Sequence, residues 1–229
     1  MQNPSAAFIP FVTSPASASM AQLIQNHPVV AILRNLPTQQ ALPYAQAAMD
    51  GGVTAFEVAM NSPNALQQIA LLKDRLGPQA VIGAGTVLSP RMAGEALAAG
   101  ASFLLSPSAD EDTLRYCQGH GVLFLPGVLT PSDVALCLRY GYTTLKLFPA
   151  GDFPPGYIKS LQGPFDNTRY VAVGGVNREN AASFIQAGYV GVGVGGGLID
   201  ARLVQEQRWD EAARQVEQLT ERVNRALGR

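Results

Sequence analysis

A lysine lies inside the apolar, strand-like segment Thr143–Ala150, which reads TTLKLFPA. Lysine is almost never fully buried without a partner, and only three of the 16 Lys and Arg residues of this chain are lysines. Side chains alternate across a strand, so Leu145 and Leu147 share one face and Lys146 lies on the other. Burial lowers the pKa of an amine, and imine formation with a ketone requires a neutral amine. Lys146 is therefore the candidate nucleophile.

A carboxylate is available in the segment TAFEVAM, where Glu57 shares a strand face with Ala55 and Ala59. Small neighbours leave room beside the carboxyl group, and in a barrel Glu57 and Lys146 would both project inward near the mouth. A carboxylate in that position can relay protons while the lysine adds to a carbonyl group. Two alternatives stay open. Lys146 pairs with an inward carboxylate for structure alone, at a high desolvation cost, or Glu57 is a solvated charge at a strand end.

Two glycine clusters end the last two expected strands. VAVGGVNREN contains Gly174 and Gly175, and GVGVGGGLID contains Gly195, Gly196 and Gly197. Bare backbone N–H groups at strand-to-helix junctions attract anions, and in barrels the loops after strands seven and eight frequently hold a phosphate. The pattern predicts a site for a phosphate or a similar anion. The alternative is that tight turns simply need glycine.

Four further residues are expected inside the barrel or at its mouth. Arg34 ends the first strand and can clamp a carboxylate with two hydrogen bonds, unless it is a plain surface arginine. Thr86, in GAGTV, can donate a hydrogen bond to a carboxylate or cap the following helix. Pro107, in LLSPS, and Phe148, on the face of Lys146, complete the candidate lining.

One pattern recurs along the chain and predicts the elements that position these residues. An amphipathic segment ends in glycine, a short apolar strand follows, and Pro or Gly closes it. The expected strands include 28–33, 80–85 and 169–175, and the expected helices lie at 38–50, 63–76, 91–99, 110–118, 131–140, 155–162, 178–187 and 207–227. Eight such units predict an α/β protein, a (β/α)8 TIM barrel of one domain. The alternative is an open doubly wound sheet.

The N-terminal residues do not fit a barrel unit. Residues 1–26 are expected to form a short extension, a loose tail or strap followed by a helix near 18–26 that caps the barrel, which then spans 27–229. The first twenty residues contain three prolines and no basic residue, which fails the signal-peptide pattern.

Composition narrows the classes of partner. The net charge is −1 and no basic run occurs, so binding of nucleic acid or of a membrane surface has no electrostatic support. No apolar run approaches the length of a membrane span. Cys117 and Cys137 are too few for a disulfide framework and are expected to be reduced thiols of a cytoplasmic protein.

Together these residues resemble a known family. The segments FEVAMNSP, VIGAGTVL, FLLSPS, FLPGVLTPSDV, LKLFPA and AVGGV are similar to those of the 2-keto-3-deoxy-6-phosphogluconate (KDPG) and 4-hydroxy-2-oxoglutarate (KHG) aldolases. The resemblance covers roughly residues 27–200. These enzymes are small class I aldolases built as (β/α)8 barrels, so the resemblance implies cleavage of a 2-keto-3-deoxy sugar acid phosphate to pyruvate and glyceraldehyde 3-phosphate. It also implies a homotrimer and no need for a metal or organic cofactor.

The resemblance assigns roles to the candidate residues. It implies that Lys146 forms the Schiff base and that Glu57 shuttles protons. Thr86 and Pro107 would line the pocket for the pyruvate carboxylate, and Phe148 would pack beside the imine. The two glycine clusters would receive the substrate phosphate.

Two departures from the family pattern bear on the substrate. Asn61 stands where phosphogluconate-type members carry an arginine, and the last cluster is all glycine where members often have a serine. AILRN and EVAMNSP look closer to the branch that acts on 2-keto-3-deoxy-6-phosphogalactonate. Loss of a guanidinium and a hydroxyl leaves an unphosphorylated 2-keto acid as an alternative substrate. In the other interpretation, Arg34 of the first strand replaces the lost contacts to the phosphate.

Other functions remain as alternatives. A metal-dependent aldolase needs ligands gathered at one site, and neither His27 nor His120 is expected to be one. An isomerase or epimerase would keep the glycine clusters but has no need for an imine-forming lysine. A binding or scaffold module would show no turnover.

Overall fold

The protein, a computed structural model, is described over residues 15–229, with side chains described from Met20 onward. The tail predicted at the N-terminus falls partly in residues 1–14, which lie outside this range. All the strands of the described chain are parallel and form one sheet. They are β1 (Val29–Leu33), β2 (Ala55–Ala59), β3 (Val81–Gly85), β4 (Leu104–Leu105), β5 (Phe124–Leu125), β6 (Gly127–Val128), β7 (Thr144–Leu147), β8 (Arg169–Val173) and β9 (Gly191–Val194).

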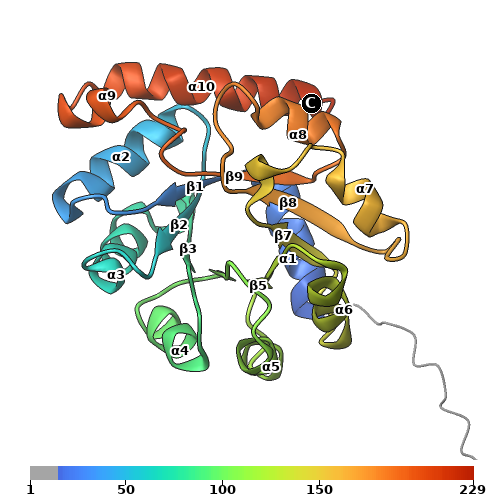
Figure 1. Ribbon diagram of the computed structural model, residues 1–229. Helices are drawn as coiled ribbons and strands as arrows, with labels where there is room; N and C mark the ends of the chain where they lie inside the picture. Colours follow the sequence, from blue (N-terminus) through green and yellow to red (C-terminus); the bar gives the residue numbers. More distant parts are fainter. Residues whose placement is uncertain (1–14) are drawn as a thin grey trace, which may run out of the picture.

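Helices ring the strands, as Figure 1 shows in a view close to the barrel axis. The α-helices are α1 (Pro15–Asn26), α2 (Thr38–Asp50), α3 (Ala65–Leu76), α4 (Pro90–Ala98), α5 (Glu111–Gly119), α6 (Pro131–Arg139), α7 (Tyr157–Gln162), α8 (Ala181–Gln186), α9 (Ala201–Gln205) and α10 (Trp209–Ala226), and two short 3₁₀ turns are η1 (Gly77–Gln79) and η2 (Ala150–Asp152). Within residues 15–229, no helix combines the length and the apolar character that crossing a membrane requires.

The sheet closes on itself through one interrupted strand. Its order runs β5-β4-β3-β2-β1-β9-β8-β7-β6, and the two ends of that order, β5 and β6, are separated in the chain only by Pro126. Proline has no backbone N–H to donate to the hydrogen bonds between strands. The Pro126 carbonyl still accepts a hydrogen bond of 2.9 Å from the backbone N–H of Lys146. Counted as one strand, β5 and β6 give the eight strands of the predicted barrel. The alternative of an open doubly wound sheet is wrong.

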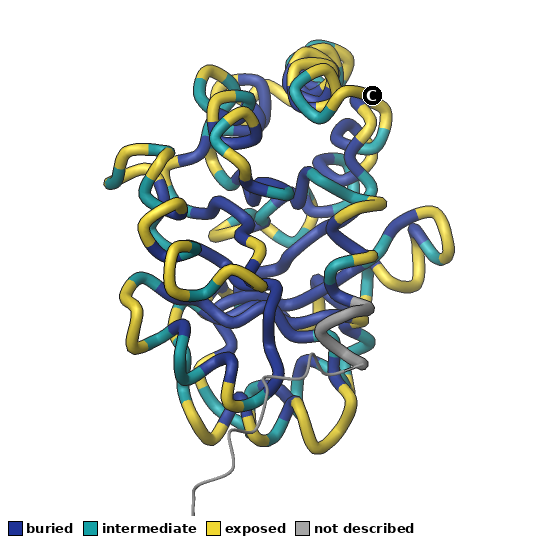
Figure 2. The backbone as a smooth tube through the Cα atoms, turned by 90° about the vertical axis from the view of Figure 1, so that its right-hand side faces the viewer, coloured by how far each residue is buried: buried dark blue, intermediate teal, exposed yellow. Residues whose placement is uncertain are grey.

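The strands separate two apolar cores, because successive side chains point to opposite faces. The larger core fills the space between sheet and helices and includes Leu145 and Leu147 of β7. The smaller one lies inside the barrel and includes Phe103, Val171 and Val173. Figure 2 shows the consequence, a buried central layer of strands beneath an exposed outer surface. Lys146 therefore lies on the inner face, as the alternation of this strand predicts.

Local sequence signals explain where the helices start and stop. The Asp110 carboxylate accepts the Thr113 N–H at 2.9 Å at the start of α5, and Thr130 and Asp133 form a reciprocal capping box at the start of α6. Glycine ends the helical segments because the chain needs a positive φ there. The predicted positions all have φ between 63° and 110°, namely Gly52, Gly100, Gly121, Gly141 and Gly188.

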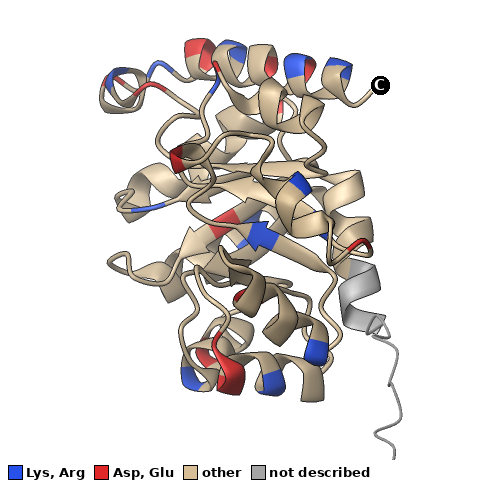
Figure 3. Ribbon diagram, turned by 45° about the vertical axis from the view of Figure 1, so that its right-hand side comes forward, with Lys and Arg blue, Asp and Glu red and all other residues tan. Residues whose placement is uncertain are grey.

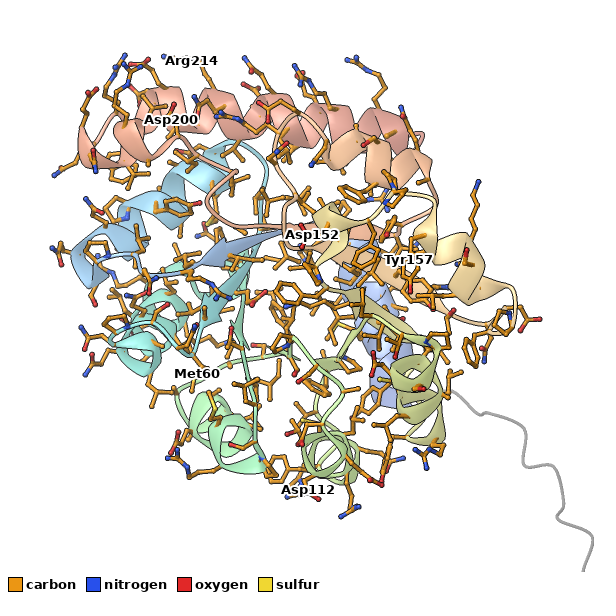
Figure 4. All side chains as sticks on the ribbon, viewed as in Figure 1. Met60, Asp112, Asp152, Tyr157, Asp200 and Arg214 are labelled. Atoms are coloured by element: carbon orange, nitrogen blue, oxygen red, sulfur yellow. The ribbon has the colours of Figure 1, made fainter. Side chains whose placement is uncertain are left out.

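Charged residues lie mainly on the outer helices and loops, as Figure 3 shows. Asp112 on α5 and Arg214 on α10 are examples that point away from the barrel in Figure 4. The apolar interior therefore makes any charged group inside the barrel conspicuous.

Helix α1 covers the end of the barrel opposite the mouth. It lies behind the strands in Figure 1 and contacts β5 and β7. Met20 and Ile24 are fully buried and join the inner core with Phe103 and Val30. Ile24 also lies over Gly191 of β9, where a Cβ atom would come within 2.8 Å of its Cγ2. The helix therefore completes the floor of the barrel.

Ile24→Ala tests this role of α1. Removing a fully buried Ile side chain should lower the free energy of unfolding by about 2–5 kcal/mol, because a cavity is left in the inner core. The matched control Gln25→Ala, on the exposed side of the same helix, should change it by no more than about 0.5 kcal/mol. Denaturant unfolding followed by circular dichroism measures both. Equal midpoints for Ile24→Ala and wild type would show that α1 does not close the barrel.

Candidate active site

Lys146 and Glu57 face each other across the interior of the barrel. Lys146 lies on β7 and Glu57 on β2, and each side chain is almost completely buried, with 3 % and 1 % of its surface exposed. Three strands, β1, β9 and β8, separate β2 from β7 in the sheet, so the two groups meet only because the sheet is closed. Neither group takes part in an ion pair formed by residues 20–229.

The surroundings favour the neutral form of the Lys146 amine. Burial lowers its pKa and is the largest influence. The negative charge of Glu57 acts in the opposite direction, and the positive charge of Arg34 lowers the pKa further. The amine nitrogen lies 5.1 Å from the centre of the Phe148 ring, which covers it on one side. A buried lysine with a lowered pKa is a suitable nucleophile for a carbonyl carbon.

The Glu57 carboxylate is buried with an unused hydrogen-bonding atom. Its Oε2 has no hydrogen-bond partner among the described residues. A buried polar atom without a partner is costly, and in a native protein it calls for an explanation. The Glu57 residue also belongs to the wall of a cavity that contains Lys146, so its carboxyl group lies beside the space that a bound molecule would fill.

A cavity of about 470 Å³ joins these groups to the strand ends. Its lining contains most of the predicted site residues, namely Arg34, Glu57, Lys146, Phe148, Gly174, Gly175, Gly195, Gly196 and Gly197. The cavity therefore has an amine and a carboxylate at its inner end and bare backbone at its rim. Its volume suits a small organic molecule.

Arg34 and Thr86 are linked across the mouth. The Arg34 guanidinium donates a hydrogen bond of 3.1 Å to the Thr86 hydroxyl oxygen. Thr86 has a φ of 56°, which is unusual for a β-branched residue. Backbone strain of this kind costs about 1–3 kcal/mol and clusters at functional sites. The helix that follows is capped by Ser89 and not by Thr86, so the capping alternative for Thr86 is wrong.

Three residues considered from the sequence are not part of the cavity lining, namely Thr86, Pro107 and Asn61. Pro107 follows β4, and its backbone packs against Gly127 of β6. Asn61 is exposed in the turn after β2. The cavity also has a residue that sequence reasoning missed: Asn177, in the turn after the Gly174–Gly175 pair. The sequence signal that could have identified Asn177 is its position two residues after Gly175.

The glycine loop after β8 is held by backbone contacts. The Gly151 N–H donates to the Gly174 carbonyl at 2.7 Å, and Gly174 and Gly175 have φ values of 86° and 72°. The helix predicted from residue 178 begins only at Ala181, and α8 has six residues. The dipole argument for an anion is thus weaker than the sequence suggested, and any anion here depends on loop N–H groups.

A larger cavity, of about 650 Å³, lies at the opposite end of the barrel. It contains His27, whose Nδ1 lies 2.8 Å from the Thr54 hydroxyl oxygen. His120 is stacked on Tyr116 on the outside. Among residues 20–229, no group of three or more His, Cys, Asp or Glu side chains is arranged to hold a metal ion. The larger cavity shares no residue with the Lys146 site and contains no comparable pair of buried charged groups.

The opposite effects of Arg34 and Glu57 on Lys146 give a prediction with a sign. Arg34→Gln removes a positive charge that lowers the pKa of Lys146, so the amine should lose its proton at higher pH. Glu57→Gln removes a negative charge that raises this pKa, so the proton should be lost at lower pH. The measurement is the pH dependence of imine trapping by borohydride at saturating pyruvate. The exposed Arg91→Gln is the control, and a shift of the two variants in the same direction would contradict the assigned electrostatics.

Comparison with known proteins agrees with this geometry. The family model described as KDPG and KHG aldolase matches residues 20–215. The 2-dehydro-3-deoxy-6-phosphogalactonate aldolase of Escherichia coli K12 is 36% identical over 81% of this chain and 91% of its own length. The 2-dehydro-3-deoxy-phosphogluconate aldolase of Pseudomonas aeruginosa is 35% identical over 85% of this chain and 87% of its own length.

A solved structure extends the likeness to the fold. The KDPG aldolase of Legionella pneumophila, crystallised with pyruvate captured as a covalent carbinolamine, superimposes with a TM-score of 0.81. It is 27% identical and covers 87% of this chain and 97% of its own. The chain therefore belongs to the KDPG and KHG aldolase family, whose members are class I carbon–carbon lyases.

Proposed function

We propose that this aldolase cleaves a 2-keto-3-deoxy-6-phospho sugar acid, of the phosphogluconate or phosphogalactonate type, to pyruvate and glyceraldehyde 3-phosphate. The observation that carries the proposal is the buried Lys146 amine, with its lowered pKa, facing the Glu57 carboxylate in one cavity. The likeness to a KDPG aldolase that holds pyruvate as a covalent carbinolamine supports the same chemistry.

The first half of the reaction forms the imine. The Lys146 nitrogen adds to the C2 carbonyl carbon, and Glu57 passes a proton to the carbinolamine oxygen, which leaves as water. The Phe148 ring, 5.1 Å from the nitrogen, packs beside the imine and keeps water from that side. In this proposal Arg34, which is hydrogen-bonded to Thr86, is positioned to hold the substrate carboxylate. Pro107, which the family resemblance assigned to the same pocket, lies outside the cavity lining and takes no part in this proposal.

The second half breaks the C3–C4 bond. Its electron pair moves into the imine to give an enamine, and Glu57 takes the proton of the C4 hydroxyl as that carbon becomes the aldehyde carbon. Protonation of the enamine and addition of one water molecule then release pyruvate and the free amine. The aldehyde end, with its phosphate, would lie against Gly174–Gly175 and Gly195–Gly197. The backbone N–H groups of these glycines are the donors that would bind the phosphate.

A second candidate is cleavage of an unphosphorylated 2-keto acid such as 4-hydroxy-2-oxoglutarate. It is favoured by the rim of the cavity, where Gly195, Gly196 and Gly197 supply no side-chain donor and Asn61 is exposed to solvent. A phosphate bound there would have fewer hydrogen-bond donors around it than a phosphate bound at a site that also offers a side-chain hydroxyl group.

The homotrimer is also part of the proposal. Leu66 and Leu88 are the exposed large apolar side chains among residues 20–229. Met60, labelled in Figure 4, lies at the end of β2 beside α3 and lines a shallow pocket with Leu66. A second copy of the chain can cover this apolar surface.

The Schiff-base role of Lys146 is tested by trapping. Borohydride with pyruvate should attach one reduced pyruvate to Lys146 of the wild type, as mass spectrometry of peptides detects. Lys146→Arg should lose both labelling and turnover, because guanidinium stays protonated, whereas the matched control Lys159→Arg, on the surface of α7, should keep both. Glu57→Gln should slow pyruvate release by about 10²–10⁴-fold. Unlabelled wild type would favour an isomerase or a binding module.

Gly196→Ser tests where the phosphate lies. A Cβ atom at Gly196 would meet nothing within 4 Å, and Gly196 does not have a positive φ, so the serine should fold without strain. Its hydroxyl would add a hydrogen bond to a charged group, worth about 1.5–3 kcal/mol. The KM for phosphogluconate- and phosphogalactonate-type substrates should fall by roughly 10–100-fold, while that for 4-hydroxy-2-oxoglutarate should not. Equal KM values in variant and wild type on the phosphorylated substrates would place the phosphate elsewhere.

A further inference from the structure

The inner face of β3 carries Val81 followed by two glycines, Gly83 and Gly85, and each glycine is covered by a different neighbour. In register, Gly83 lies beside Glu57 and Gly85 beside Ala59 of β2. A Cβ atom at Gly83 would come within 2.6 Å of the Phe103 ring, which belongs to the inner core. The strand therefore leaves two places inside the barrel, which are filled by the side chain of Phe103, directly before β4, and by that of Glu57 on β2.

The second of these places is occupied by the Glu57 carboxyl group. A Cβ atom at Gly85 would overlap the Glu57 Oε1 and Cδ atoms and lie 2.6 Å from Cγ. Real Cβ atoms essentially never come within 3.0 Å of another heavy atom. Gly85 does not have a positive φ, so its backbone conformation does not itself demand glycine. The demand comes from the side chain that lies over it.

Little else fixes the direction of that carboxylate. Its Oε2 has no hydrogen-bond partner, and Glu57 enters none of the ion pairs found in residues 20–229. Glu57 stands on β2, yet its carboxyl group leans sideways over β3 and stays on the cavity wall. Packing into the space above Gly85 is thus the contact that sets its position.

We propose that Gly85 is a positioning residue for the Glu57 carboxylate. The inference rests on the proposed function, in which Glu57 moves protons between substrate atoms. A general acid–base must come within about 2.6–3.2 Å of the proton it transfers, and a misplacement of about 1 Å can cost about 10²-fold in rate. Any side chain at position 85 pushes the carboxylate out of its place and removes it from the reacting atoms.

A double-mutant cycle isolates this contact. Gly85→Ala should lower kcat by about 100-fold and change KM by much less, because Lys146 and the glycine rim are untouched. Glu57→Asp shortens the side chain by one methylene and withdraws the carboxyl group from the added methyl. In the Glu57→Asp background, Gly85→Ala should therefore lower kcat by less than about tenfold, a coupling of more than about 1.4 kcal/mol.

Two matched glycine-to-alanine controls separate positioning from a general loss of stability. Gly83→Ala adds a methyl group on the same strand and the same face, but against Phe103. It should lower the melting temperature, and Glu57→Asp should not relieve that loss. Gly119→Ala, at the end of α5, meets nothing within 4 Å and should behave as wild type.

These experiments test the positioning role of Gly85 separately from the proposed aldolase function. Additive effects of Gly85→Ala and Glu57→Asp on kcat, or wild-type kcat in Gly85→Ala, would overturn it. If Gly85→Ala does not fold, Glu57→Ala/Gly85→Ala decides: recovered folding supports the contact, and continued failure overturns it. If the wild type neither labels nor turns over, the aldolase proposal fails, and a crystal structure of Gly85→Ala then tests whether the Glu57 carboxyl group has moved, as expected, or has stayed.

Discussion

The structure depends on keeping an amine and a carboxylate buried in the same apolar barrel without pairing them. Lys146 and Glu57 are both almost inaccessible to water, yet neither enters an ion pair among the residues described. A tight pair would hold the lysine protonated, and an isolated lysine would lack a group to move its protons. Closure of the sheet provides the intermediate arrangement, since it brings β2 and β7 to opposite sides of one cavity.

The space for this arrangement comes from glycines in the neighbouring strands, which have no side chains to fill it. Gly85 receives the Glu57 carboxyl group, and Gly193 makes room for Val173 and Ile32 beside the cavity. The floor below is sealed by the inner core and by Ile24 of α1. The barrel is thus solid at its base and hollow at its mouth, which is the end where the strands terminate and where barrel enzymes carry their sites.

The sequence was most informative where one residue controls one local feature. Alternation along TTLKLFPA placed Lys146 on the inner face, and glycine after each helical segment marked the start of the next strand, because positive φ is a local requirement. It was least informative where distant strands meet. The sequence did not show that the strand interrupted at Pro126 continues as β6. The Arg34–Thr86 hydrogen bond joins two residues 52 positions apart, which follow β1 and β3 on either side of β2.

Two further differences between the expected and the observed helices lie in the C-terminal part of the chain. The helix expected over 207–227 is present as α10, and the structure adds the short helix α9 before it. Gln207, with a φ of 55°, lies in the turn that separates these two helices. The turn after Gly175 delays α8 to Ala181, because Asn177 and Asn180 bond to backbone groups there and compete with the helix. Propensity alone does not reveal such a competition. Pro107 lies outside the cavity lining for a tertiary reason, since it packs on Gly127.

The central claim, a neutral amine held inside the barrel, is measured most directly by an NMR titration. The chain has only three lysines, so the ¹³Cε signals of Lys73, Lys146 and Lys159 are assigned by Lys73→Arg and Lys159→Arg. The Lys146 signal should titrate below the ordinary lysine pKa of 10.5, because burial disfavours the charged amine. A Lys146 signal that titrates at or above this ordinary pKa would contradict the neutral amine.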